Sequence, residues 1–473
     1  MRKIYYLVVC LFFLHKPHIQ AQSLKESSFR IKGKIIGGKV SSLQILTEGL
    51  FYNKADSLPI RADGQFDMLV KTYGKVEMGV FFDTSVLVIN AAPGEVINFC
   101  YDLKAGKLVG ISGQTPQQTK RLKYDAATLF SAGSRRQLMF MRMRDQNQPD
   151  SVKYALCAAS YRLELDSLIQ QRGILGAALD EYVDELYFSY INMMDFSGLK
   201  DYEKLVQLTL GSGYKGVPQA DHYKILSKDI LLRSNEYRRW IFGETRERVR
   251  GDLDYLYVKF LDIQKAASWV EFYKAQGISD PFIKNWYACY SIFFSFQNYN
   301  FSETEKVKDT FLIQCQDPSF KRVINDYWAS DIKFKTGAPA PTIALTDYKG
   351  NRVELNDFKN KVIYIDFWGV HCGACLIQMK EYSPSVETKY GNPDLVFLYV
   401  CVEGDKAEQE KIISDLGLKG IHAFCSWQTA IDKYNVNSLP HYMIIDKQGN
   451  IRDYHAHNPQ EILDQPEFSK LLQ

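Results

Sequence analysis

One segment in the last third of the chain reads Ile365-Asp366-Phe367-Trp368-Gly369-Val370-His371-Cys372-Gly373-Ala374-Cys375. The apolar run from Val362 to Trp368 predicts a central strand, because strands buried on both faces are apolar nearly throughout. The residues from Cys375 to Tyr390 predict a helix that Pro384 should kink. Two cysteines with CxxC spacing therefore lie where a strand gives way to a helix.

This placement favours redox chemistry at the cysteine pair. Cys372 would lie at the helix N-terminus, where free backbone N–H groups and the helix dipole stabilise a thiolate. Cys375 would lie inside the first turn, more buried and suited to resolving a mixed disulfide. Zinc sites use the same spacing, but a structural zinc site usually needs a second pair, and the sequence has no other CxxC.

The sequence changes character near Thr336. Pro339 and Pro341 block helix continuation and mark a domain boundary. Beyond them, apolar runs at Leu395–Val402 and Tyr442–Asp446 predict further strands, separated by helical stretches. Strands that alternate with helices indicate an α/β sheet.

The stretch from 336 to 473 resembles the TlpA/ResA-type envelope thioredoxins. Three motifs in the family's order carry this resemblance: the segment around the two cysteines, the entry motif Gly337-Ala338-Pro339-Ala340-Pro341, and the loop Val436-Asn437-Ser438-Leu439-Pro440-His441 with its following hairpin. The resemblance covers under a third of the chain and implies a C-terminal α/β thioredoxin fold.

The resemblance also implies roles for single residues. Cys372 would be the attacking thiol and Cys375 the resolving thiol, while Asp366 matches a buried carboxylate that assists proton removal from the second cysteine. Pro440 would be a cis-proline, a conformation found in about 5–6% of X–Pro bonds, which exposes the backbone of Leu439 to substrate. The implied substrate-binding residues are Trp368, His371, Leu439, Pro440 and His441.

Four positions depart from the usual family pattern. His371 replaces a Trp, and we expect it to shape the docking surface rather than to lower the pKa of the neighbouring thiol. Ala374 replaces the commonest Pro, which leaves the reduction potential open. Gln378 stands where some family reductases carry Glu, so no acid–base role is available there. His441 replaces a Thr and would place a second imidazole near the dithiol.

The sequence favours an exported thiol–disulfide oxidoreductase of the reductase type, without a cofactor. Its partners would be disulfide-containing envelope proteins and a membrane electron donor, because the periplasm is oxidising. One alternative is a copper or zinc module built from Cys372, Cys375 and His441, since thiolates and imidazoles bind both metals. The other is a non-catalytic binding protein whose N-terminal regions do the work. A peroxiredoxin is disfavoured because Gly369 stands where that family has Thr.

The N-terminus predicts export. Arg2 and Lys3 precede the apolar run Ile4–Leu14, and a polar stretch follows to a small residue, Ala21. This is the order of a signal peptide over residues 1–21, and the run is too short for a spanning helix of about 20 residues. The expected location is the periplasm or cell envelope.

Two further regions precede the thioredoxin-like part. Residues 27–113 alternate apolar and polar positions between turn dipeptides, which predicts a small antiparallel β domain, a sandwich. In its spacing and in the segments Arg61–Phe66 and Ala92–Ile97, it resembles the β domain before thioredoxin domains in many Gram-negative envelope proteins. Residues 114–335 carry apolar residues at helical spacing and predict a helical middle region. The aromatic-rich stretch from Phe282 to Phe301 favours a buried helix face over a binding groove.

Charge and cysteine content limit the function classes. The net charge of +3 comes from the basic leader, so the mature chain is near neutral and nucleic-acid binding is disfavoured. Nine cysteines in 473 residues are too sparse for a disulfide scaffold. Cys401 and Cys425 are expected to be buried thiols, although a second disulfide stays open, as does the oligomeric state.

Overall fold

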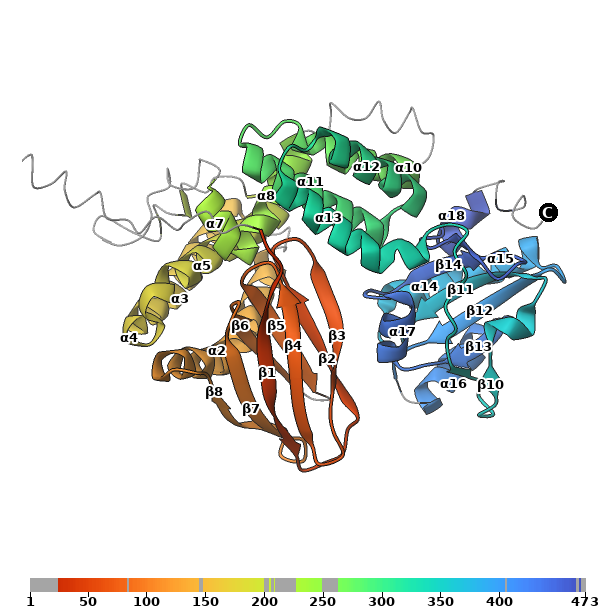
Figure 1. Cartoon of the computed structure of the whole chain (residues 1–473), viewed down its shortest axis with the longest axis horizontal. Helices are drawn as coiled ribbons and strands as arrows, with labels where there is room; N and C mark the ends of the chain where they lie inside the picture. The colour runs from red at the N-terminus through yellow and green to blue at the C-terminus, as the bar shows by residue number, and fades with distance from the viewer. Residues whose placement is uncertain are drawn as a thin grey trace, which may run out of the picture.

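A computed structural model gives the structure of the chain for residues 24–82, 85–143, 148–199, 204–205, 208, 227–248, 263–404, 406–464 and 468. The predicted signal peptide, residues 1–21, lies outside the described residues. Figure 1 shows three parts: a β domain, a group of helices above it, and an α/β domain at the C-terminal side. None of the described helices is long and apolar enough to cross a membrane.

The β domain consists of two four-stranded sheets, ordered β4-β1-β7-β8 and β3-β2-β5-β6. Buried and exposed residues alternate along most of the strands, and the buried ones form one hydrophobic cluster. The strands are β1 Ser27–Ile36, β2 Ser42–Glu48, β3 Asn53–Pro59, β4 Gln65–Thr72, β5 Val76–Phe82, β6 Ser85–Ala91, β7 Val96–Asp102 and β8 Lys107–Ser112.

One strand pair corrects the expectation of an antiparallel domain. β1 pairs with β4 in antiparallel register, but β1 and β7 run parallel, with Arg30 opposite Val96. Both kinds of pairing place alternate side chains on opposite faces of the sheet. The period of two in the sequence therefore could not distinguish them.

The middle region is helical in its described parts. Its elements are α2 Pro116–Met143, α3 Asp150–Gln170, α4 Arg172–Leu175, η1 Gly176–Ala178, α5 Leu179–Phe196, α7 Lys228–Arg233, α8 Asn235–Arg248, α10 Ile263–Ala275, α11 Pro281–Asn298, α12 Phe301–Gln314, α13 Pro318–Asp331 and η5 Ile332–Phe334.

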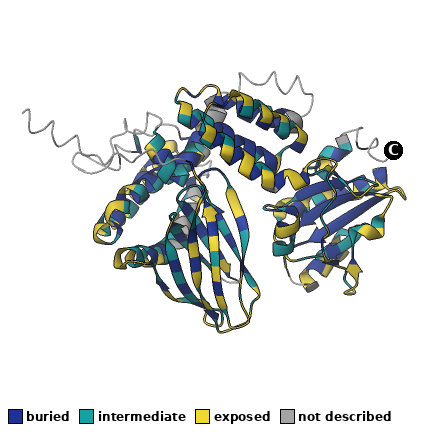
Figure 2. Cartoon of the chain, viewed as in Figure 1, coloured by how far each residue is buried: buried dark blue, intermediate teal, exposed yellow. Residues whose placement is uncertain are grey.

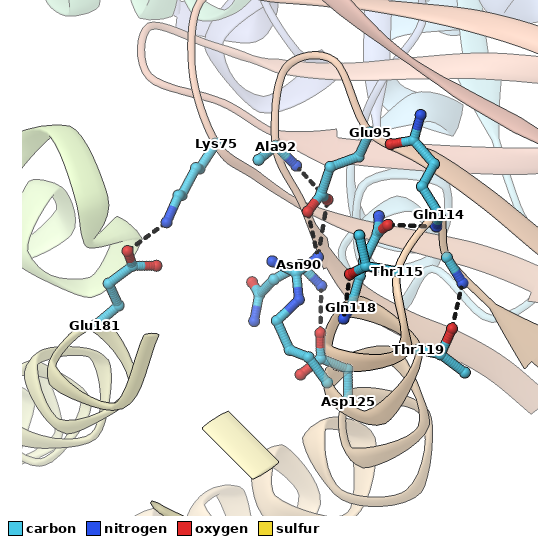
Figure 3. Close-up of polar contacts among 12 residues, drawn as sticks. Lys75, Asn90, Ala92, Glu95, Gln114, Thr115, Gln118, Thr119, Asp125 and Glu181 are labelled. Carbon is cyan, nitrogen blue, oxygen red and sulfur yellow. Dashed lines mark hydrogen bonds and ion pairs between the residues drawn. The ribbon is translucent and has the colours of Figure 1, made fainter. Parts of the chain in front are cut away.

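Polar contacts join α2 to the edge of the β domain (Figure 3). Both carboxylate oxygens of Glu95 accept hydrogen bonds from Arg121 at 2.8 Å. The carboxyl group of Asp125 is fully buried and accepts a hydrogen bond from the Asn90 backbone at 3.0 Å. Burial raises the pKa of Asp125 to about 7, against the opposing effects of its hydrogen bonds and of Arg121.

The aromatic-rich helix α11 is the centre of the helical region. Trp286 and Tyr287 are completely buried, as expected for a buried helix face. The Trp286 indole donates to the Leu50 carbonyl at 2.7 Å, so the loop after β2 is fixed against this helix. The N-terminal end of α11 is therefore tied to the β domain.

The C-terminal sheet has the order β10-β9-β13-β12-β11-β14-β15. The central strand β11 pairs in parallel with β12 and antiparallel with β14, and it is buried along its whole length (Figure 2). Its elements are β9 Leu345–Thr346, β10 Arg352–Val353, η6 Leu355–Phe358, β11 Val362–Trp368, α14 Gly373–Glu381, α15 Ser383–Tyr390, β12 Leu395–Cys401, α16 Lys406–Leu416, β13 Ile421–Phe424, α17 Trp427–Tyr434, β14 His441–Ile445, β15 Ile451–Asp453 and α18 Pro459–Asp464.

The two faces of this sheet belong to different cores. One face packs with α14, α15 and α16, while the other joins a hydrophobic cluster that continues into the helical region. Phe334 stacks on Tyr454 with ring centroids 4.7 Å apart, and His455 Nε2 lies 2.6 Å from the Phe296 carbonyl oxygen. The helical region and the α/β domain thus share a core.

Candidate active site

The cysteine pair lies at the start of α14, directly after the loop that follows β11. Cys372 and Cys375 form a disulfide bond, with Cα atoms 5.2 Å apart. Cys372 is the N-cap of the helix and is half-buried, whereas Cys375 is fully buried. The Cys375 backbone N–H donates to Cys372 Sγ at 3.2 Å. The outer sulfur therefore faces both solvent and the positive end of the helix dipole.

Asp366 lies on β11 on the same face of the sheet as Cys375. Tyr364 and Trp368, two positions before and after it, pack in the cluster that contains Cys375, and side chains two apart on a strand share a face. The Asp366 carboxyl group is fully buried without a hydrogen-bond partner in the described structure. Burial raises its pKa to about 8, which suits a group that exchanges a proton near neutral pH.

Pro440 brings a second chain segment to the cysteine pair. The Leu439–Pro440 peptide bond is cis. Pro440 and Ala374 both line a cavity of about 340 Å³, together with Gln378 and His441. Leu439 and Pro440 are half-buried, so this loop and the start of α14 form one surface.

The two histidines that depart from the family pattern have different environments. His371 is exposed, in keeping with a docking surface. His441 is 7% exposed, and burial and the nearby His455 lower its pKa well below the ordinary value. Burial lowers the pKa of His455 to about 4. Both buried imidazoles are therefore neutral at neutral pH.

Trp368 does not have the environment expected of a substrate-binding side chain. It is completely buried in the core beneath the cysteine loop. The proposed substrate contact through this side chain conflicts with that burial, and its position indicates a packing role. The sequence suggested otherwise because Trp368 adjoins the loop, while its strand register places it on the inner face.

Glu403 is a site residue that the sequence reasoning missed. Its Oε1 accepts a hydrogen bond from the His371 backbone at 3.0 Å, so it holds the loop just before Cys372. A Cβ atom added at Gly369 would lie 2.3 Å from the same oxygen. No motif marks Glu403; its only signal is an acidic residue soon after the strand next to β11.

The remaining cysteines of this domain are separate from the dithiol. Cys401 and Cys425 are unbonded, and burial raises the pKa of each thiol to about 12. Among the described residues, no group of three His, Cys, Asp or Glu side chains could hold a metal ion. The alternative of a copper or zinc module from Cys372, Cys375 and His441 therefore has no geometric support.

Comparison with known proteins gives likenesses for part of the chain. A family model described as Redoxin matches residues 335–472. A thiol-disulfide oxidoreductase ResA of Bacillus thuringiensis (strain Al Hakam) is 29% identical over 125 residues, which are 26% of this chain and 72% of that protein. ResA of Geobacillus kaustophilus (strain HTA426) is 28% identical over 130 residues, covering 28% of this chain and 74% of the relative.

Among solved structures, a putative thiol-disulfide oxidoreductase from Bacteroides vulgatus is 28% identical, with a TM-score of 0.27, and covers 30% of this chain and 96% of that one. The residues matched by the family model include both cysteines of the disulfide.

Proposed function

We propose that this chain, which is a thioredoxin-fold thiol–disulfide oxidoreductase through its C-terminal redoxin domain, reduces disulfides of partner proteins in the bacterial cell envelope. The observation that carries the proposal is the bonded pair at the start of α14, with Cys372 accessible and Cys375 buried. An envelope location is supported by the order of basic, apolar and small residues at positions 1–21.

The reaction begins from the reduced dithiol. The Cys372 thiolate attacks one sulfur of the partner disulfide, a bond forms between these two sulfurs, and the partner's S–S bond breaks. The released partner thiolate takes a proton from water. The helix N-terminus favours the thiolate form of Cys372, because the anion lies at the positive end of the dipole.

Cys375 then resolves the mixed disulfide. Its thiol gives a proton to the Asp366 carboxylate, and the resulting thiolate attacks Cys372 Sγ. The Cys372–Cys375 disulfide forms, and the second partner sulfur leaves and takes up a proton. The partner has gained two electrons and two protons, and a dithiol donor at the membrane restores the reduced chain.

Cysteine substitutions test the site assignment. Cys372→Ser should abolish insulin reduction, and Cys375→Ser should accumulate mixed disulfides visible on non-reducing gels. Cys100→Ser is the matched control, because Cys100 is an unbonded, partly exposed cysteine in the β domain. Full insulin-reduction activity in both dithiol variants would refute the assignment.

The reduction potential of the pair tests the direction. Titration against dithiothreitol or glutathione, followed by thiol labelling, should give a value near or below about −250 mV, in the range of thioredoxin-type reductants. A value near about −120 mV would mean that the chain oxidises its partners instead.

A further inference from the structure

Two cavities adjoin beside the dithiol. One has a volume of about 340 Å³ and is lined by Ala374 and Pro440, and the other has about 300 Å³ and is lined by residues of the β domain, including Asn53. They share four lining residues, Gln297, Asn298, Ser438 and His441. We call the two cavities together the interdomain groove; each has a volume typical of small ligand sites.

All three parts of the chain contribute to this groove. Asn53 begins β3 and Tyr52 directly precedes it. Gln297 and Asn298 come from the last turn of α11, and Ser438 from the loop before Pro440. His455 Nε2 lies 2.6 Å from the Phe296 carbonyl oxygen, so the end of α11 is fixed against the α/β domain. The helical region therefore forms one wall of the cavity that Ala374, which lies between the two cysteines, also lines.

Two residues that line the groove have a buried polar atom without a partner in the described structure. His441 is 7% exposed, and its Nε2 atom has no hydrogen-bond partner in the described structure. Asn437 donates from Nδ2 to Asn435 Oδ1 at 2.9 Å, which leaves its own buried Oδ1 unpaired. An unpaired buried polar atom is destabilising, so both atoms would gain from a hydrogen-bonding group that reached them.

The groove is also nearly free of charge. Among the described residues that line it, Glu461 alone carries an ordinary charged side chain, and that carboxylate accepts from the Asn458 backbone at 3.0 Å. Carboxamides predominate instead, at Asn53, Gln297 and Asn298. Carboxamides both donate and accept, which matches the N–H and C=O groups of an extended backbone.

The geometry points to the interdomain groove as a recognition site for an extended polypeptide segment that flanks the partner's disulfide, with Gln297 and Asn298 as specificity-determining residues. This inference rests on the proposed function and assigns to the helical region a part in choosing the substrate. The segment would lie along the groove with its cystine at Cys372, and its side chains next to the cystine would pass the end of α11.

Charge placed at Asn298 tests this inference in the full-length protein. Asn298→Glu and Asn298→Lys are assayed with two unstructured decapeptide dimers, each joined by one cystine, that carry either two Lys or two Glu beside it. The small disulfide 5,5′-dithiobis(2-nitrobenzoate) serves as the third substrate. Gln314→Glu and Gln314→Lys are matched controls, because Gln314 is the last residue of α12, is exposed, and lies outside the groove.

The expected result is a reversal of preference. Asn298→Glu should raise the ratio of kcat/KM for the Lys peptide over the Glu peptide by at least about fivefold, and Asn298→Lys should lower it equally, an effect that salt screens. A folding defect alone would lower kcat/KM for both peptides by the same factor. If the Asn298 variants show the same ratio of kcat/KM for the two peptides as the Gln314 variants, the inference is refuted while the proposed function stands. If the unaltered protein reduces neither the peptides nor the small disulfide, the proposed function itself fails.

Discussion

Asp366 is a buried acid whose ionisation should be visible in stability as well as in catalysis. Its folded-state pKa of about 8 lies above the ordinary 3.8, so its stabilising contribution is fully present below pH 4 and is lost as the pH rises through 8. Asp366→Asn removes this loss. The variant should match the parent near pH 4 and exceed its free energy of unfolding at pH 9 by on the order of a few kcal/mol in urea titrations.

The same substitution should change the pH profile of the second chemical step. In the parent, release of the second partner thiol should accelerate as the pH rises through about 8, because ionised Asp366 can accept the Cys375 proton. The Asn variant should lack this inflection in stopped-flow measurements. An unchanged profile would remove Asp366 from the mechanism.

Gly369 and Glu403 offer a second test at single residues. A Cβ at position 369 would lie 2.3 Å from Glu403 Oε1, so Gly369→Ala should displace the carboxylate from the His371 N–H. We expect a loss of about 1 kcal/mol in the free energy of unfolding, the contribution of one hydrogen bond. Gly373→Ala is the matched control, because nothing lies within 4 Å of its added Cβ and Ala favours the helix. Equal losses in both variants would contradict the role of Glu403.

At the scale of elements, the junction between α2 and the β domain should make stability depend on pH. The Asp125 pKa of about 7 exceeds its unfolded value, so the contribution of this carboxyl group is lost as the pH rises from 4 through 7. Asp125→Asn should therefore gain roughly 2 kcal/mol relative to the parent between pH 5 and pH 8. The amide oxygen of the variant can still accept from the Asn90 N–H, and its NH2 group would face the Tyr182 hydroxyl, which donates to Asp125 in the parent.

Urea denaturation at the two pH values measures this difference. Asp415→Asn on α16 is the control, since Asp415 is exposed and its substitution should change the free energy of unfolding equally at both pH values. If the free energies of unfolding of Asp125→Asn and the parent differ by the same amount at both pH values, Asp125 is already ionised in the folded chain.

Several elements could be predicted from the sequence because their determinants are local. β11 has the predicted bounds, Val362–Trp368, since a fully buried strand needs an unbroken apolar run. The helix after the cysteines breaks before Pro384 into α14 and α15, because proline lacks an N–H and clashes with the preceding turn.

Other features depend on contacts that are distant in sequence. The burial of His441 follows from packing against Tyr454 and His455, and the link between Glu403 and His371 spans two segments. Gln297 shares a cavity with Ala374 and Pro440 only through the tertiary fold. Residue spacing gives no information about contacts between distant segments, so the roles of these residues could not be predicted from the sequence.

At the scale of the whole molecule, the shared core predicts which parts unfold together. Phe334 is 1% exposed and stacks on Tyr454, so Phe334→Ala should cost about 3–5 kcal/mol. Hydrogen exchange measured by mass spectrometry should show faster exchange in α13, β14 and β15, while β1–β8 stay protected.

Phe99→Ala is the matched control for this experiment. Phe99 is 2% exposed in the separate core of the β domain, so its truncation should deprotect the β domain and spare β14 and β15. Uniform deprotection in both variants would mean that the chain unfolds as one unit.

The wall that α11 places beside the dithiol has a consequence for timing. A segment must be extended to lie in the groove, so a cystine held within a folded partner reacts no faster than that partner opens locally. For such partners the slow step is the opening of the partner, and a moderate change in the reactivity of the Cys372 thiolate would leave the overall rate unchanged. Cystines of newly exported chains, which form before folding is complete, would therefore be reduced first.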